Sequence, residues 1–247
     1  MGKYFAYDYH GAPFVLFGAG HLAFLAVVTA IALFLIYGWK NPSEKAKRRG
    51  RHILIAVIVI GEASWHLWNI YWGHWTIQTM LPLHMCSMMI NLAIIMLITR
   101  NYRLYEYVYF LGIGGAMQPV LTPEAGIYGL PHFRAFQTLT VHSALLLSGI
   151  YMTAVEGFRP TWRSFWRVFV FTNLYAAVVY VINLLIGSNY LFIMEKPATA
   201  SLMDILGPWP WYLVSLEAIA FIIFFMLYLP FAIKDWRANK MQTAMAK

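Results

Sequence analysis

The fold is decided by long apolar stretches, the first of which reads FVLFGAGHLAFLAVVTAIALFLIYG at residues 14–38. It contains no Asp, Glu, Lys or Arg, and it exceeds the roughly 20 apolar residues that a transmembrane helix needs. Because these stretches are continuously apolar rather than alternating, they favour helices over the strands of a membrane barrel. We therefore predict an all-α polytopic membrane protein, a single domain with seven transmembrane helices. The other six stretches are residues 52–74, 80–99, 104–122, 135–156, 166–188 and 211–233.

The composition of the whole chain agrees with this fold class. Of its 247 residues, 61% are hydrophobic and only 11% are charged, which is about half the charged fraction of a soluble domain. The composition therefore excludes a soluble globular enzyme, a disordered chain and a disulfide-stapled domain. The chain has one cysteine, so no internal disulfide can form.

Basic residues predict the orientation of the helices. All but three of the 18 Lys and Arg residues fall in connections, or at a chain end, that share one side of the membrane; the exceptions are Lys3, Arg134 and Lys196. By the positive-inside rule, this bias places the N-terminus outside and the C-terminus in the cytoplasm. We interpret the basic run at residues 45–51 as a solvated inner loop near anionic lipid heads, so we expect no nucleic-acid partner.

Polar side chains recur at one depth in the predicted helices. At about 1.5 Å per residue, their positions fall roughly 6–12 Å below the outer surface. Polar groups inside spans are costly and often functional, which favours one shared, partly hydrated cavity near the outer face. The alternative is a set of separate interhelical hydrogen bonds. The residues of this layer are His21, His66, His84, Cys86, Gln118, His142, Asn183 and Glu217.

The second predicted helix carries Glu62, His66 and Asn69 on one face, at the spacing i, i+4 and i+7. A carboxylate one turn away can orient or charge a histidine, and this makes the histidine a usable base. We expect Glu62 and His66 to act in catalysis and Asn69 in substrate binding. The alternative is a neutral packing pair of Glu62 and His66.

The third predicted helix begins with LPLHMCS at residues 81–87. Free backbone N–H groups at a helix start favour a thiolate and can hold an oxyanion, so Cys86 is a candidate nucleophile. Its base must come from another helix, and His142 and His66 lie at the same depth. We expect His84 to bind substrate. The alternative is that Cys86 is simply a small buried hydrophobic residue.

Further polar residues complete the predicted substrate site. Gln118 lies beside the helix-kinking Pro119, with helix packing as the alternative role for this segment. His132 and Arg134 precede the fifth predicted helix and can capture an anionic head group, unless they belong to a solvated loop. The remaining candidate substrate-binding residues are His21, Asn183 and Glu217.

Short motifs are spread over nearly the whole chain. They are WHLWN at 65–69, LPLHMC at 81–86, LTP at 121–123, PHFR at 131–134, His142, GFRPTW at 157–162, GSNYL at 187–191 and LGPWPWY at 206–212. This pattern resembles the YwaF-type family of bacterial integral membrane proteins, which implies a multi-pass protein of the bacterial plasma membrane. More distantly, the chain resembles transmembrane protein 164 and the androgen-induced membrane hydrolases.

The resemblance also implies a chemistry. Transmembrane protein 164 is described as a phospholipid acyltransferase that uses a cysteine acyl-enzyme, and the androgen-induced hydrolases cleave lipid esters with a threonine and a histidine. Carried over to this chain, Cys86 would hold the acyl group and His142 would be the base. In the eukaryotic motif the cysteine directly follows the proline, where this chain has Leu83, so Cys86 stands three residues further on.

Two functions follow from these residues. The first is a lipid acyltransferase or lipid-ester hydrolase that acts on membrane phospholipids in the outer leaflet, through Cys86 with His142, or with His66 backed by Glu62. The second is a transporter or lipid-binding protein in which Glu62, His66 and Glu217 form a proton or ion relay. No metal-binding motif occurs, so we predict no cofactor; a zinc site built by three histidines is a third alternative.

Overall fold

The structure is a computed structural model that describes residues 2–123, 126–197 and 202–245. In these residues the chain forms seven continuous helical rods joined by loops and short 3₁₀ turns, without strands. One rod combines three elements and is called the bent helix below. The rods are α1 (Ala19–Leu33) with η2 (Phe34–Gly38); α2 (Glu44–Tyr71); α3 (Met85–Thr99); the bent helix of α4 (Tyr102–Tyr107), η3 (Val108–Ile113) and α5 (Gly114–Leu121); α6 (Phe133–Ala154); α7 (Trp162–Ile186); and α8 (Trp211–Met245).

Each rod coincides with one of the predicted apolar stretches. Four rods are long and apolar enough to cross a membrane by length and composition, namely Ala19–Gly38, Glu44–Tyr71, Trp162–Ile186 and Trp211–Met241. Their outer faces carry apolar side chains that no other part of the described chain covers, such as Leu185, which is 78% exposed. The chain is therefore a helical membrane protein. The count of seven spans and their orientation stay predictions.

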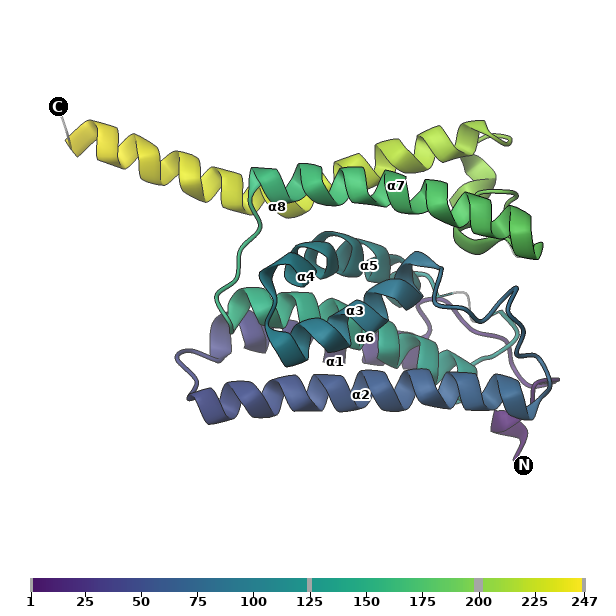
Figure 1. Cartoon of the computed structure of the whole chain (residues 1–247). Helices are drawn as coiled ribbons and strands as arrows, with labels where there is room; N and C mark the ends of the chain where they lie inside the picture. The colour runs from purple at the N-terminus through teal and green to yellow at the C-terminus, as the bar shows by residue number, and fades with distance from the viewer. Residues whose placement is uncertain (1, 124–125, 198–201, 246–247) are drawn as a thin grey trace.

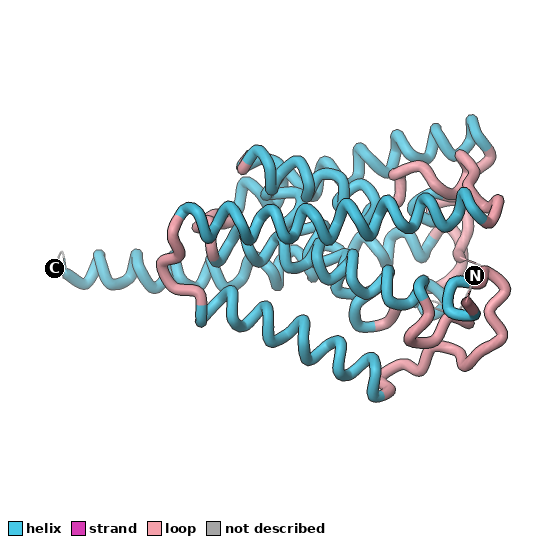
Figure 2. Tube along the Cα trace, turned by 90° about the horizontal axis from the view of Figure 1, so that it is seen from below, coloured by secondary structure: helices cyan, strands magenta, loops and turns pink. Residues whose placement is uncertain are grey.

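The rods are stacked in layers (Figure 1). α2 lies on one side of the molecule, α7 and α8 lie on the opposite side, and α3 and the bent helix lie between them. The N-terminus and the longest loops gather at one end of the bundle, while α8 extends beyond the other end (Figures 1 and 2). We call these the loop end and the basic end, because Lys40 to Arg51 and Arg159 to Arg167 lie at the latter.

Helix α6 is the centre of the bundle, because it contacts α1, α2, α3 and the bent helix. It also buries more polar side chains than a lipid-facing helix would, among them Gln137, Ser143 and Ser148. The hydroxyl of Ser148 donates to the carbonyl of Ala144, one turn earlier in the same helix. Small and hydroxylated residues of this kind let helices approach closely in a membrane, which explains why the least lipid-like rod is the most buried one.

The bent helix departs from α-helical geometry at η3, which is a π-helical segment that leads directly into Gly114. Its glycines permit close contacts with two neighbouring helices. A Cβ atom at Gly114 would lie only 2.8 Å from Ile223 of α8, and one at Gly112 would lie 3.2 Å from Leu145 of α6. The glycines therefore set the distances between the bent helix and its neighbours.

Candidate functional site

Cys86 is the second residue of α3 and is half-buried. Helix α3 begins at Met85, later than the predicted start at residue 80, with His84 as an N-cap whose side chain makes no capping hydrogen bond. Within the part of the chain that the structure describes, no side chain accepts from the backbone N–H groups of the first turn, which carry the positive end of the helix dipole. Cys86 thus lies within the first turn.

The turn before α3 is held by two tyrosines from the other side of the bundle. The hydroxyl of Tyr190 accepts from the N–H of Leu81 at 2.8 Å and donates to the carbonyl of Ile77. The hydroxyl of Tyr175, on α7, donates to the carbonyl of Leu83 at 3.0 Å. These bonds occupy backbone groups of Ile77, Leu81 and Leu83 in a non-helical segment. The helix therefore starts only at Met85, and Cys86 lies at its N-terminal end.

The side chain of Cys86 faces the bent helix. A Cβ atom added at Gly115 would lie 3.9 Å from the Cys86 Sγ, which is ordinary van der Waals contact. Glycine at this position leaves open the space on one side of the thiol.

Helical spacing puts His142 near the face of α6 that packs on the same bent helix. Leu145 and Gly149 follow at i+3 and i+7 on that face, and they contact Gly112 and Ile113 respectively. The Nδ1 atom of His142 lies 2.8 Å from the carbonyl oxygen of Thr138. A carbonyl oxygen only accepts, so Nδ1 carries the proton and the neutral ring has its lone pair on Nε2. Among the described residues, none donates to this Nε2.

His66 has the opposite arrangement. The indole N–H of Trp75 donates to Nδ1 of His66 at 2.9 Å, so the neutral ring carries its proton on Nε2. That Nε2 lies 3.7 Å from Oε1 of Glu62, at the i, i+4 spacing read from the sequence. Both ring nitrogens of His66 therefore have partners, and the lone pair on its Nδ1 accepts the hydrogen bond from Trp75.

Arg134 links α6 to α2 beside this pair. Its guanidinium lies 3.9 Å from the centre of the Trp65 ring and donates to Gln137 and Thr138 of its own helix. Gln137 in turn donates to the carbonyl of Gly61 on α2 at 3.2 Å. The cation is held by an aromatic face and by hydrogen bonds within the α2–α6 contact.

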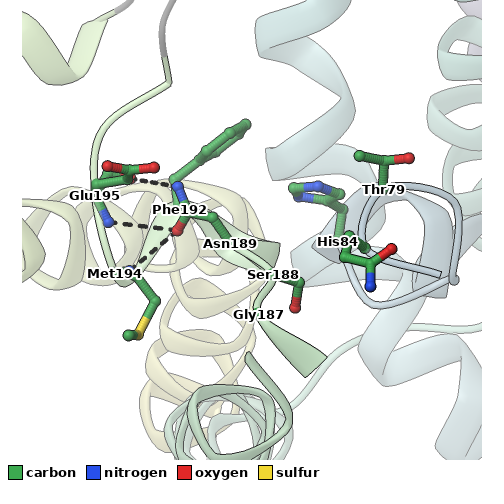
Figure 3. A pocket seen from close by; sticks show the side chains of 9 residues that line it. Thr79, His84, Gly187, Ser188, Asn189, Phe192, Met194 and Glu195 are labelled. Atoms are coloured by element: carbon green, nitrogen blue, oxygen red, sulfur yellow. Dashed lines mark hydrogen bonds between the residues drawn. The ribbon is translucent and has the colours of Figure 1, made fainter. Parts of the chain in front are cut away.

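His84 lies at a polar cavity of about 340 Å³ at the loop end of the bundle. Figure 3 shows His84 and Thr79 on one side of this cavity, and Asn189, Phe192 and Glu195 from the segment after α7 on the other side. The N–H of Leu191 donates to Nδ1 of His84 at 3.3 Å, so the neutral ring keeps an N–H donor on Nε2. The cavity adjoins the start of α3 and therefore lies close to Cys86 in the chain.

Three predicted site residues are buried, and their polar side-chain atoms are bound to loops and helix ends. His21 accepts from the N–H of Phe17, and its Nε2 donates to the carbonyl of Val120 at the end of α5. His132 caps α6, and its Nε2 donates to the carbonyl of Ala6. Asn183 closes the end of α7 by bonds to Ser188 and to both backbone groups of Tyr190.

The last three predicted residues have hydrogen-bond partners of their own. Asn69 is buried and donates to the carbonyl of Trp65 in its own helix. Gln118 is exposed and donates to Thr122 at the end of α5. Glu217 of α8 accepts from Asn173 of α7 at 2.7 Å. These polar side chains therefore have separate hydrogen-bond partners, and a cavity shared by the whole layer stays a prediction. Cys86 contacts the bent helix, while Glu62, His66 and Arg134 lie at the α2–α6 contact.

Sequence reasoning missed two buried carboxylates at the basic end. The side chain of Glu106, on α4, is 1% exposed and binds Ser164 and Arg167 of α7. Glu156, which follows α6, is fully buried and pairs with Arg51 and Arg100. The sequence does contain a sign of these ion pairs, because both glutamates stand near the end of an apolar stretch and close to arginines. These ion pairs fasten the helices together and are distant from Cys86.

No group of three or more His, Cys, Asp or Glu side chains within residues 2–123, 126–197 and 202–245 is arranged to hold a metal ion.

A family model, that of the TMEM164 family, matches residues 16–228. The match agrees with the distant resemblance to transmembrane protein 164, whereas the YwaF-type resemblance stays a prediction. No curated protein and no solved structure matches the chain.

Proposed function

Because the chain belongs to the TMEM164 family, we propose that this membrane protein is a lipid acyltransferase or lipid-ester hydrolase with a Cys86–His142 site. Family membership suggests a lipid-related function in the membrane. The main support for the proposal is that Cys86 contacts the bent helix, that helical spacing puts His142 near the face of α6 that packs on the same helix, and that the tautomer of His142 leaves Nε2 as a base. Membrane phospholipids are the substrates that we propose.

The proposed reaction has two halves. In the first, Nε2 of His142 takes the proton of the Cys86 thiol, and the thiolate attacks the carbonyl carbon of a phospholipid ester. The tetrahedral intermediate expels the lysolipid alkoxide, which takes the proton back from His142. In the second half, a lipid hydroxyl or water attacks the thioester, gives its proton to His142, and releases the thiolate, which is then reprotonated.

The start of α3 supports this chemistry in a second way. Among the described residues no side chain accepts from the N–H groups of its first turn, so these groups would be available to the negative charge on the ester oxygen if Cys86 is the nucleophile. The cavity beside His84 fits a polar head group, because its walls carry Gln78, Thr79 and Asn189. The ester of a phospholipid lies just below its head group, so head group and ester match the two neighbouring sites.

We assign the base to His142 rather than to His66. The lone pair of the neutral His66 ring accepts from Trp75, so His66 would have to break this bond before it could take a proton. We assign to Glu62 and Arg134 a role in holding the α2–α6 contact. With the predicted orientation, the site lies in the outer leaflet of the plasma membrane.

A proton or ion relay through Glu62, His66 and Glu217 is the alternative function. The contact between Glu62 and His66 favours it. However, Glu217 belongs to α8, on the opposite side of the bundle from α2 (Figure 1), and binds Asn173 there. A relay needs neighbouring groups, so the acyl-transfer proposal is the better supported one.

The test uses the fact that Cys86 is the only cysteine of the chain. Purified full-length protein is incubated in vesicles with a phospholipid whose acyl chain carries an alkyne tag. We expect a label on the protein that hydroxylamine removes, as expected for a thioester. Cys86→Ala should abolish the label, and the neighbouring variant Ser87→Ala should keep it. Equal labelling of Cys86→Ala and the unaltered protein would overturn the proposal, and the released products separate a transferase from a hydrolase.

A further inference from the structure

A second cavity, of about 450 Å³, lies at the basic end, between η2, α2 and α6. It therefore lies at the opposite end of the bundle from the cavity beside His84 (Figure 1). Its walls are mainly apolar, and Lys45 and Arg49 stand at its edge, in the first two turns of α2. The side chains that shape the walls are Phe34, Leu35, Trp39, Ile53, Leu147 and Tyr151.

The cavity has walls that are fixed by close packing. A Cβ atom at Gly50 would lie 2.7 Å from the hydroxyl of Tyr151, so only glycine lets α2 and α6 approach this closely. The same hydroxyl donates to the carbonyl of Lys47 at 2.7 Å. Trp39 packs edge-on against the Tyr151 ring, just after the π-helical segment η2. The cavity is thus preformed rather than opened by a ligand.

Lys45 and Arg49 differ from Lys47 and Arg51, two basic residues of the same helix that form ion pairs. Lys47 pairs with Glu44, and Arg51 pairs with Glu156. Within the described part of the chain, Lys45 and Arg49 are exposed and pair with no carboxylate. They stand at i and i+4, where two like charges repel each other along a helix. An anion placed between them would relieve this repulsion, and both side chains border the same apolar cavity.

We propose that this cavity binds an anionic phospholipid, with an acyl chain against the apolar walls and the phosphate between Lys45 and Arg49. Basic pockets between helices on the cytoplasmic side bind anionic lipid head groups in this way. An apolar space beside two unpaired cations fits a lipid better than a soluble anion, because a soluble anion would leave the apolar walls in contact with water. This site does not depend on the acyl-transfer proposal, and Cys86→Ala should bind the lipid as the unaltered protein does.

The test measures lipid binding to the full-length protein by native mass spectrometry. Phosphatidylglycerol and phosphatidylcholine with the same acyl chains are titrated in parallel. The variant Lys45→Gln/Arg49→Gln should lower the affinity for phosphatidylglycerol by about 30-fold, which corresponds to about 2 kcal/mol for two basic side chains. Its affinity for phosphatidylcholine should stay unchanged.

The matched control is Arg48→Gln/Lys234→Gln, which removes the same charge from exposed positions away from the cavity. It should bind both lipids like the unaltered protein. A second variant, Ile53→Trp, narrows the cavity at a side chain that is 64% exposed, and it should weaken the binding of both lipids. The proposal is overturned if Lys45→Gln/Arg49→Gln keeps its full affinity for phosphatidylglycerol, if the control loses as much, or if Ile53→Trp binds both lipids unchanged.

Discussion

Nδ1 of His142 donates to the carbonyl oxygen of Thr138, one turn earlier in α6, at 2.8 Å. This bond fixes the orientation of the ring and the nitrogen that carries the proton. It therefore decides which of the two candidate histidines can act as a base without first losing a partner, and the first two predictions rest on it.

Replacing His142 with Gln should lower the acylation rate of Cys86 by about 10²–10⁴-fold, the usual contribution of a general base. Gln keeps the size and polarity of the side chain but cannot take a proton at neutral pH. The measurement is the rate of hydroxylamine-sensitive labelling. Labelling of Cys86 by a small maleimide should persist in the variant and shows that the thiol is intact. An acylation rate equal to that of the unaltered protein would rule out His142 as the base.

Replacing His66 with Gln should leave the same acylation rate nearly unchanged. Its two ring nitrogens are occupied by Trp75 and Glu62, so its role is to hold the α2–loop contact. A modest fall in thermal stability is expected instead, since Trp75 loses its acceptor. If His66→Gln stops acylation while His142→Gln does not, the assignment of the base is reversed.

Replacing Glu156 with Gln should destabilise the protein by about 3–5 kcal/mol, because it leaves Arg51 buried without a counter-charge. Thermal unfolding in detergent measures the effect. The matched control is Glu44→Gln: this carboxylate also forms an ion pair, with Lys47, but its side chain is 72% exposed. The control should change stability little, as surface ion pairs usually do. Equal losses in the two variants would show that burial of the pair is unimportant.

Stability should also depend on pH through His132, the buried N-cap of α6. Burial lowers its pKa below the ordinary 6.5, while the bond to Ala6 partly opposes this. The unfolded chain therefore takes up a proton at a higher pH than the folded protein, and the free energy of unfolding falls as the pH drops through 6.5 toward the folded pKa. Melting temperatures between pH 8 and 5 measure the slope.

The variant His132→Asn keeps a capping side chain but removes the titrating group, so it should flatten this pH dependence. His10→Asn, at an exposed histidine, is the control and should keep the slope. If His132→Asn shows the same slope as the unaltered protein, another group is responsible.

The helices could be read from the sequence because each one is an apolar stretch bounded by proline, glycine or charge. The contact of Glu62 with His66 could also be read, since helical spacing alone sets it. The burial of His21, His132 and Asn183 could not. His21 and His132 bind backbone carbonyls that are far away in the chain, and Asn183 binds the irregular loop that follows its own helix; helical spacing predicts neither kind of partner.

The position of Cys86 within its helix shows the same limit. Proline at position 82 predicted a helix that starts near residue 80, because proline suits a first helical turn. In the fold, Tyr190 and Tyr175 bind the backbone of this turn, and the helix starts at Met85. Two tertiary contacts thus override a local preference and bring the thiol closer to the helix end than the sequence indicates.

The central position of α6 has a consequence for biosynthesis. Because it carries a buried glutamine and buried serines, this helix would insert unfavourably into the lipid bilayer without other helices around it. However, α1, α2, α3 and the bent helix precede it in the chain, so its partners are synthesised first. During synthesis, α6 can therefore pack against these helices as soon as it leaves the ribosome. The order of the helices in the chain thus sets the order in which the bundle assembles.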